Sequence, residues 1–171
     1  MKVTVLRLGH RFGRDHRIST HLCLVARAFG AAKIVFDEED RRLAESVGAV
    51  IENWGGDFSV EFTKNWKKYV ESFAGEKIHL TMYGINVNNC MGEISSSEKD
   101  KLVIVGGKKV PSDLYEIADY NVAVGSQPHS EVAALSVFLD RLFSGRELGV
   151  NFGGKREIVP KERGKLVVEK D

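Results

Sequence analysis

Four arginines and two histidines lie within eleven residues near the start of the chain, from Arg7 to Arg17, with Asp15 as their only carboxylate. Guanidinium groups stay charged at physiological pH, and their planar forks of N–H donors match phosphate oxygens. So dense a cationic segment needs an anionic partner, and an RNA or DNA backbone is the first candidate. Any one of these arginines alone would more often form a surface salt bridge, so the prediction depends on their density.

The charge along the chain supports this interpretation. The formal net charge is only +1, but residues 1–33 hold seven basic side chains against one acidic one, whereas residues 37–61 hold eight acidic side chains against two basic ones. A basic face that binds a polyanion and an acidic face that does not are therefore expected.

Three glycine-bearing strand ends in the second half of the chain form a second candidate site. Residues 80–84, 103–111 and 122–131 each follow or include an apolar run that ends in glycine. Parallel sheets bind ligands beyond the carboxyl ends of their strands, and glycine lets the backbone approach a ligand closely. Each segment alone is typical of ordinary strand-to-helix turns, but together they predict a cofactor pocket beside the polyanion site.

Composition and motifs narrow the function further. The 171 residues fit one domain with its own core, and Cys23 and Cys90 match no metal or redox spacing, which favours buried thiols in a reducing compartment. No signal sequence and no membrane span are recognised, so a soluble, cytoplasmic protein is expected. The G-x-G-x-x-G and Walker motifs are missing, and the five histidines form no ligand set, so no metal is assigned.

Short apolar runs alternate with segments of helical period, which predicts an α/β fold with a mostly parallel sheet flanked by helices. The expected strands are residues 3–8, 33–36, 49–51, 78–82, 101–105 and 120–124. The expected helices begin at Ser19 or Thr20, at Asp37 and at Asp57, and end near Gly30, Gly48 and Gly75. Residues 85–100 are expected to form a mobile surface loop.

The C-terminal third holds two further elements. The segment after Pro128 has apolar residues on almost every side of a predicted helix, from Val132 to Phe143. Such a helix must be buried on more than one side, and packing against a second copy would achieve this, so a homodimer is predicted. Residues 156–170 contain two short β-prone runs around a glycine-containing turn and predict a β-hairpin.

The same residues carry a resemblance to a known family. Residues 5–17, Thr20-His21 and 26–31, together with segments 80–84, 106–111 and 125–131, resemble the archaeal tRNA ribose methyltransferases that modify the T-loop cytidine at tRNA position 56. The resemblance spans almost the full chain. It implies a SPOUT-type fold with a deep C-terminal trefoil knot in a domain of residues 1–150, an added β-hairpin at 151–171, a working dimer, and S-adenosylmethionine as cofactor.

The resemblance also implies roles for individual residues. The implied cofactor-binding residues are Leu80, Thr81, Met82, Gly84, Gly106, Gly107, Lys108, Lys109, Val110, Val124, Gly125, Ser126, Gln127, Pro128, His129, Ser130 and Glu131. An arginine near the reacting ribose is the implied catalytic residue: Arg17 is the first candidate, Arg11 and Arg14 are next, and Arg27 is an alternative. Because its pKa exceeds about 12, such an arginine is expected to fix the neighbouring phosphate rather than to act as a base.

Two other functions remain open from the sequence. A non-catalytic RNA-binding domain would use the same arginines without a cofactor. A methyltransferase could also act on another nucleotide of tRNA or rRNA, because RNA specificity comes largely from shape and splayed bases. Only the family resemblance points to the tRNA cytidine.

Overall fold

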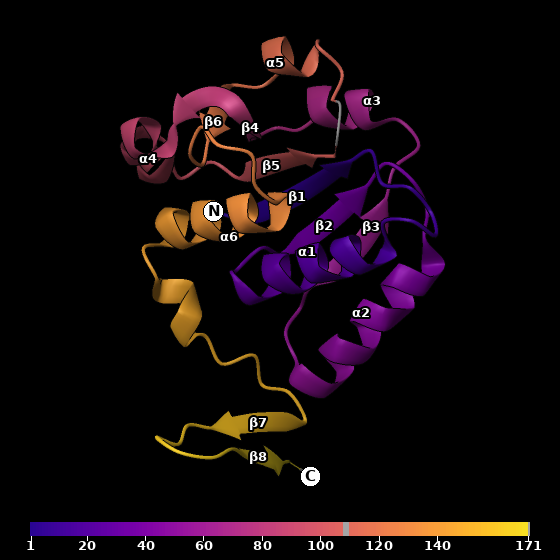
Figure 1. Ribbon diagram of the computed structural model, residues 1–171, viewed down its shortest axis with the longest axis vertical. Coiled ribbons are helices and arrows are strands. Elements are labelled where there is room, and N and C mark those ends of the chain that lie inside the picture. The colour runs from indigo at the N-terminus through magenta and orange to yellow at the C-terminus, as the bar shows by residue number, and fades with distance from the viewer. Residues whose placement is uncertain (108–109, 171) are drawn as a thin grey trace.

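The computed structural model describes residues 1–107 and 110–170, and it shows a six-stranded sheet in the order β3-β2-β1-β5-β4-β6 (Figure 1). All pairings in this sheet are parallel, which confirms the predicted α/β class. The strands are β1 (Val3–Leu8), β2 (Lys33–Phe36), β3 (Ser59–Phe62), β4 (Glu76–Asn86), β5 (Lys101–Gly106) and β6 (Tyr120–Ala123). The helices are α1 (His16–Ala28), α2 (Arg41–Trp54), α3 (Trp66–Glu71), α4 (Val87–Ser96), α5 (Leu114–Ile117), α6 (Glu131–Phe143) and the 3-10 turn η1 (Arg146–Gly149).

Helices cover both faces of the sheet. On one face, α1, α2, α4 and α6 bury a large apolar cluster that includes Leu22, Val47 and Phe138. On the other face, α3 and α5 pack Val70 and Leu114 against residues of the central strands. Strand β1 is buried along its whole length because it lies between β2 and β5 with helices on both sides. Its carboxyl end, which leads into the arginine segment, is therefore fixed at the middle of the sheet.

Two predicted elements are wrong around residues 49–62. Residues 49–51 are not a strand, because α2 continues through Gly48 to Trp54. Gly48 lies on the exposed side of the helix, and Leu43 and Val47 are buried one turn apart on the other side. The helix starts after Asp40 rather than at Asp37, and the Asp40 carboxylate accepts a hydrogen bond from the amide of Leu43 at 3.1 Å. Residues 59–62 pair with β2 as a strand, so the helix expected from Asp57 begins only at Trp66, after the cap Asn65.

The expected loop at residues 85–100 is also wrong. Strand β4 extends to Asn86, whose side chain caps α4 by accepting a hydrogen bond from the Asn88 amide at 2.9 Å. Val87, Cys90 and Ile94 bury one side of this helix, and their spacing is helical although the segment is rich in asparagine and serine. The first helix likewise begins earlier than expected, at His16 instead of after Ser19 or Thr20.

Strand β4 has an irregularity that shapes the carboxyl edge of the sheet. Leu80 and Ile85 both pair with Val122 of β6, so the register shifts by the residues between them. The segment Thr81–Gly84 therefore has no paired residue on β6 and bulges away from the ladder. Gly84 lies against the backbone of Asn121, where a Cβ atom would come within 2.4 Å of the carbonyl carbon and oxygen.

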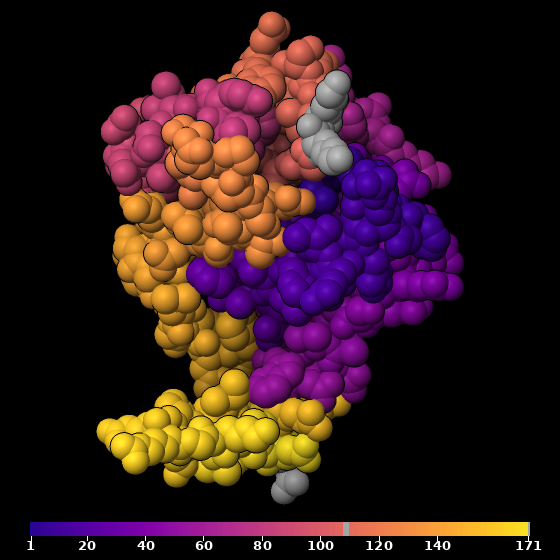
Figure 2. All heavy atoms as spheres, in the orientation of Figure 1, coloured from indigo at the N-terminus to yellow at the C-terminus, as the bar shows by residue number. Residues whose placement is uncertain are grey.

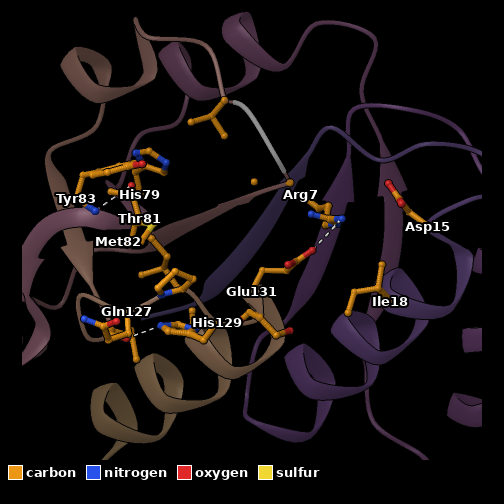
Figure 3. A pocket seen from close by; sticks show the side chains of 18 of the residues that line it. Arg7, Asp15, Ile18, His79, Thr81, Met82, Tyr83, Gln127, His129 and Glu131 are labelled. Atoms are coloured by element: carbon orange, nitrogen blue, oxygen red, sulfur yellow. Dashed lines mark hydrogen bonds and ion pairs between the residues drawn. The ribbon is translucent and has the colours of Figure 1, made fainter.

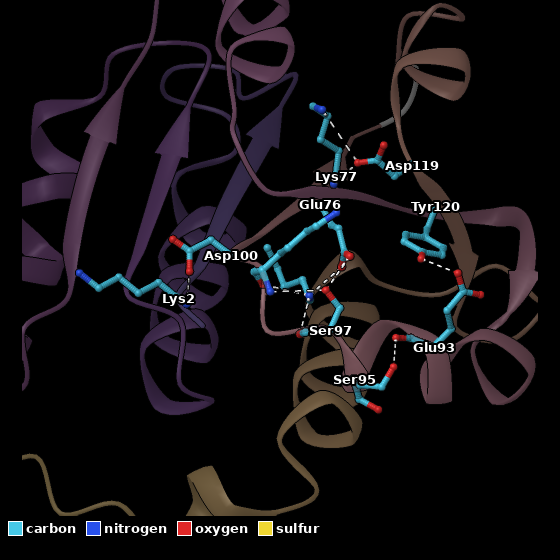
Figure 4. Close-up of polar contacts among 12 residues, drawn as sticks. Lys2, Glu76, Lys77, Glu93, Ser95, Ser97, Asp100, Asp119 and Tyr120 are labelled. Atoms are coloured by element: carbon cyan, nitrogen blue, oxygen red, sulfur yellow. Dashed lines mark hydrogen bonds and ion pairs between the residues drawn. The ribbon is translucent and has the colours of Figure 1, made fainter.

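Polar contacts fasten the opposite edge of the sheet (Figure 4). The buried ammonium group of Lys101 forms an ion pair with Glu76 at 2.6 Å and donates to the carbonyl oxygens of Ser97 and Lys99. The backbone amide of Lys2 donates to Asp100, and the hydroxyl of Tyr120 donates to Glu93 at 2.8 Å, which raises the pKa of Tyr120 to about 12. These contacts join the start of β1, β4, β5 and β6 at the amino edge of the sheet.

The C-terminal residues form the predicted hairpin from β7 (Arg156–Val159) and β8 (Leu166–Glu169), which pair antiparallel. Figures 1 and 2 show the hairpin at one end of the molecule, beside α2. Arg27 lies between the end of α2 and the segment that leads to the hairpin: its guanidinium donates to the carbonyl oxygens of Trp54 and Gly55, at the end of α2, and lies 4.5 Å from the centroid of the Phe152 ring. Burial lowers the pKa of Arg27.

Helix α6 is buried on several sides within the single chain. It packs against α1 and α4 and buries Leu135, Phe138 and Leu139. Ala133 and Val137 remain exposed on its outer side. Both cysteines lie in the apolar core as free thiols, as predicted, and burial raises the pKa of Cys23 to about 12.

Candidate functional site

A pocket of about 720 Å³ lies at the carboxyl edge of the sheet, between the ends of β1, β4, β5 and β6 (Figure 3). Its volume is in the range of small-molecule and cofactor sites. It is lined by Arg7, Arg11, Asp15, Ile18, His79, Leu80, Thr81, Met82, Tyr83, Gly106, Gly107, Val110, Tyr115, Val124, Gln127, Pro128, His129, Ser130, Glu131 and Ala134. The glycine-bearing strand ends and part of the arginine segment therefore meet in one place.

One wall of the pocket is a set of interlocked polar side chains on β4 and α5. The hydroxyl groups of Thr81 and Tyr115 are 3.1 Å apart, and the ring of His79 packs edge-on against Tyr115. Nδ1 of His79 lies 2.9 Å from the side-chain oxygen of Asn121, whose amide nitrogen donates to the Tyr115 carbonyl oxygen. Because the Asn121 amide nitrogen is used in this way, its side-chain oxygen faces His79 and accepts a hydrogen bond from Nδ1–H. Burial lowers the pKa of His79.

The turn between β6 and α6 closes another side. Gly125 has a φ of 76°, a conformation that favours glycine, and lets the chain turn sharply after β6. His129 then reaches back, with Nε2 at 2.5 Å from the carbonyl oxygen of Val124 and Nδ1 at 3.0 Å from that of Ser130. The Ser130 hydroxyl caps α6 by accepting from the amide of Val132. The turn is therefore held by its own side chains.

The wall formed by the end of β1 and the start of α6 carries a buried ion pair. Arg7 is only 2% exposed, and its Nη2 lies 3.0 Å from Oε1 of Glu131, which is 24% exposed (Figure 3). Nε and Nη1 of Arg7 are buried without a hydrogen-bond partner. The density of the arginine segment predicts that Arg7 binds an external phosphate, but Arg7 instead forms an ion pair with Glu131 of the same chain.

Arg11 and Asp15 form a second pair at the same side of the pocket. The Asp15 carboxylate accepts from Nε and Nη2 of Arg11 at 3.0 and 2.8 Å and from the Arg11 backbone amide at 3.1 Å. These hydrogen bonds, led by the guanidinium, hold the pKa of Asp15 below its usual value, and the same pairing raises that of Arg11. The pair closes a tight turn between β1 and α1.

A buried network fixes the start of the arginine segment. Asp37 accepts from the backbone amides of Gly9 and His10, and the His10 ring lies between Ser19 Oγ at 2.9 Å and Asp40 Oδ2 at 3.3 Å. The same Asp40 oxygen is 3.5 Å from His16 Nδ1. Burial acts to raise the pKa of Asp40, but hydrogen bonds from Leu43, His16 and His10 outweigh it, so the pKa is lowered.

Most of the predicted cofactor residues line this pocket: Leu80, Thr81, Met82, Gly106, Gly107, Val110, Val124, Gln127, Pro128, His129, Ser130 and Glu131. Gly84, Gly125 and Ser126 shape the loops without lining it, and Lys108 and Lys109 lie outside the described residues. Of the candidate catalytic arginines, Arg11 lines the pocket, whereas Arg14 and Arg17 are exposed beside it. Arg27 faces the C-terminal segment instead.

The sequence reasoning missed the roles of His79, Tyr115, Asp15 and Ile18 in this pocket. His79 and Tyr115 come from elements that contact one another only in the folded sheet, so no local spacing signals their partnership. Asp15 did carry a signal, because a carboxylate four residues after Arg11 is the spacing of a side-chain pair on one turn.

The described residues contain neither a metal-ligand group nor a membrane-spanning helix. In residues 1–107 and 110–170, no group of three or more histidine, cysteine or acidic side chains is arranged to hold a metal ion. In the same part of the chain, no helix has the length and apolar character needed to cross a bilayer.

Comparison with solved structures shows which proteins share this fold. The chain superposes on the TrmH/SpoU tRNA modifying enzyme of A. aeolicus with a TM-score of 0.61 at 13% identity, over 85% of this chain and 76% of that one. It superposes on the SpoU methyltransferase AviRb from Streptomyces viridochromogenes, solved with AdoMet, with a TM-score of 0.56 at 12% identity, over 87% and 59% of the two chains. The fold is thus that of the SpoU/TrmH class of SPOUT methyltransferases.

Sequence comparison identifies the family within that class. Residues 54–168 match the family model described as tRNA ribose 2'-O-methyltransferase, aTrm56. The tRNA (cytidine(56)-2'-O)-methyltransferase of Methanocaldococcus jannaschii is 56% identical over 173 aligned positions, covering 98% of this chain and 97% of that protein. The chain belongs to the aTrm56 family of tRNA ribose 2'-O-methyltransferases.

Proposed function

We propose that this protein methylates the ribose 2'-oxygen of cytidine 56 in tRNA, with S-adenosylmethionine as the methyl donor. The observation that carries this proposal is the 56% identity, along nearly the whole chain, to a relative named for that reaction. The pocket supports it, because the segments predicted to hold a cofactor line a cavity of suitable size beside the arginine segment.

The pocket residues fit S-adenosylmethionine. Gly106 and Gly107 leave the end of β5 without side chains, and Leu80, Met82, Val110 and Val124 give apolar walls that suit an adenine ring and a sulfonium methyl group. Thr81 and Gln127 add polar groups that can orient the ligand. When bound, the cofactor supplies a methyl group already activated by a positively charged sulfur.

The arginine segment suits the RNA side of the reaction. Arg14 and Arg17 are exposed, and neither forms an ion pair within the described part of the chain. We assign to Arg17, and next to Arg14, the binding of a phosphate beside the target ribose, which would align the 2'-hydroxyl with the methyl donor. Arg11, already held by Asp15, would shape the turn that presents them.

The proposal includes an assembly. Residues 1–150 would form the methyltransferase domain with a deep C-terminal trefoil knot, and residues 151–171 the added hairpin. Two copies would associate as a homodimer in the cytoplasm, without a bound metal. The exposed apolar side of α6, at Ala133 and Val137, supports association through this helix.

Incubating unmodified tRNA with methyl-labelled S-adenosylmethionine, then mapping the labelled nucleotide, tests the reaction and its target together. We expect label on the ribose of cytidine 56. Label on another nucleotide would favour the alternative of a different target. Salt-sensitive RNA binding with no cofactor binding would favour a non-catalytic RNA-binding domain.

The cofactor site has its own test in Gly106→Leu. A Cβ at this position would lie 2.1 Å from Cγ1 of Val110, so a larger side chain must enter the pocket or displace its wall. We expect weaker binding of S-adenosylmethionine in calorimetry. Gly92→Leu, on α4 where a Cβ meets nothing within 4 Å, is the matched control. Unchanged affinity of Gly106→Leu would remove this loop from the site.

A further inference from the structure

Methylation of a ribose hydroxyl releases a proton, and the arginines cannot accept it because they stay charged. A proton acceptor must lie near the reacting oxygen and keep a free lone pair. The groups that line the pocket can therefore be sorted by what their acceptor atoms already contact in the described structure.

Most of them are engaged. Both ring nitrogens of His129 face backbone carbonyl oxygens, and the hydroxyls of Thr81 and Tyr115 contact each other. The Asp15 carboxylate accepts three hydrogen bonds from Arg11. His79 keeps Nε2, but its side chain is only 1% exposed, so a ribose hydroxyl has little access to it.

Glu131 differs from all of these. One carboxylate oxygen, Oε1, pairs with Arg7, whereas no hydrogen bond to Oε2 is found among the described residues. The side chain is 24% exposed and lines the pocket.

Glu131 lies between two walls of the pocket. In Figure 3 it lies with Arg7 between the wall of His79, Thr81 and Met82 and the wall of Asp15 and Ile18. The first wall belongs to the proposed cofactor loops, and the second belongs to the segment proposed to bind RNA. A cofactor bound at the first wall and a ribose bound at the second would therefore have this carboxylate between them.

We propose that Glu131 is a catalytic residue whose carboxylate accepts the proton of the target 2'-hydroxyl. This rests on the proposed function. The ribose oxygen forms its bond to the methyl carbon while its proton moves to Glu131, and the carbon–sulfur bond breaks with its electron pair remaining on sulfur. Glu131 later gives the proton to water.

Arg7 is the positioning residue for this carboxylate. Its guanidinium is buried, and its remaining nitrogens, Nε and Nη1, have no other partner, so the pair with Glu131 is its one polar contact among the described side chains. The pair therefore holds Oε1 of the carboxylate and leaves Oε2 without a hydrogen bond among the described residues.

Glu131→Gln is the direct test, because glutamine keeps the shape and can still accept a hydrogen bond from Arg7. We expect the single-turnover rate with saturating tRNA and cofactor to fall at least about 100-fold. The tRNA affinity in filter binding should stay within about threefold, and saturating cofactor separates the rate effect from any change in S-adenosylmethionine binding, because Glu131 also lines the proposed cofactor pocket. Glu116→Gln, on an exposed part of α5 outside the pocket, is the matched control. An unchanged rate in Glu131→Gln would overturn the proposal.

Glu131→Ala allows chemical rescue by a small carboxylate. We expect added formate to raise its rate in proportion to formate concentration, and to leave Arg17→Ala without gain. A lack of rescue in an alanine variant that binds both ligands normally would count against proton acceptance.

Substitution of Arg7 tests its positioning role. We expect Arg7→Gln to lower kcat while the KM for tRNA stays within about threefold, and Arg7→Lys to recover part of the loss, because lysine can still contact Oε1 of Glu131. An unchanged kcat in Arg7→Gln would remove the positioning role. If the wild-type protein methylates no cytidine 56, the proposed function itself fails; if it does so and Glu131→Gln is equally active, only this inference fails.

Discussion

At the scale of single residues, the arginine segment divides into two pairs with different surroundings. Arg7 and Arg11 are matched by Glu131 and Asp15 of the same chain. Arg14 and Arg17 are exposed beside the pocket. The first pair thus forms part of the wall of the pocket, and the second is the pair that we propose to bind phosphate.

We predict that Arg17→Ala abolishes methyl transfer and leaves S-adenosylmethionine binding intact. The side chain is exposed and outside the pocket lining, so its loss should not disturb the cofactor walls. Transfer of labelled methyl to tRNA and calorimetric titration of the cofactor measure the two effects. A variant with normal turnover would remove Arg17 from the mechanism.

We predict that Asp40→Asn lowers the free energy of unfolding by about 1–3 kcal/mol at pH 7, since Asp40 joins His10, His16 and the start of α2. The folded-state pKa of Asp40 is lowered, so its stabilisation is present above the unfolded pKa of about 3.9 and is lost as pH falls through the folded pKa. Urea unfolding should therefore show the two proteins converging below about pH 4.

If the difference between Asp40→Asn and the wild type persists unchanged at lower pH, the charge of Asp40 is not the source of the stabilisation. Ser46→Ala is a suitable control, because the Ser46 hydroxyl only bonds the carbonyl of Arg42 on the exposed side of the same helix. We expect it to change stability little at any pH.

Some of the pocket could be foreseen from residues alone. Glycines at strand ends predicted that the segments around Gly106 and Pro128 meet at one edge, because parallel strands end together. The contact of His79 with Tyr115 could not be foreseen, since 36 positions separate them and the pairing depends on β4 and α5 packing together.

At the scale of elements, predictions held where a strand is buried on both faces, as for β1 and β2, whose bounds were correct. They failed where glycine or polar residues were taken as stops. Gly48 lies on the exposed side of α2, where a helix tolerates it, so residues 49–51 continue the helix. Residues 59–62 form a strand because they pair with β2, and the spacing of residues along this segment does not reveal that pairing.

Arg27 makes the attachment of the C-terminal hairpin testable. Arg27→Ala removes hydrogen bonds to Trp54 and Gly55 and the contact with the Phe152 ring. A two-stranded hairpin is marginally stable alone, so we expect faster proteolysis at residues 151–155 and a loss of about 2–3 kcal/mol in unfolding free energy. Equal cleavage rates for variant and wild type would show that other contacts hold the hairpin.

At the scale of the whole molecule, we predict a homodimer. Sedimentation at micromolar concentration should give twice the 19.0 kDa mass of one chain. Val137 is 39% exposed on the outer side of α6. Val137→Glu places a charge there and should shift the protein toward the monomer. A wild-type monomer under these conditions would contradict the assembly.

The bulge in β4 has a consequence for how binding can be observed. Met82 and Tyr83 lie where the ladder to β6 is interrupted, and both side chains are exposed beside the pocket. In the free protein their amide hydrogens should exchange with deuterium much faster than those of Ile78 and His79 in the same strand. A ligand that occupies the pocket should slow this exchange, so mass spectrometry of one peptide would report occupancy before any methyl group is transferred.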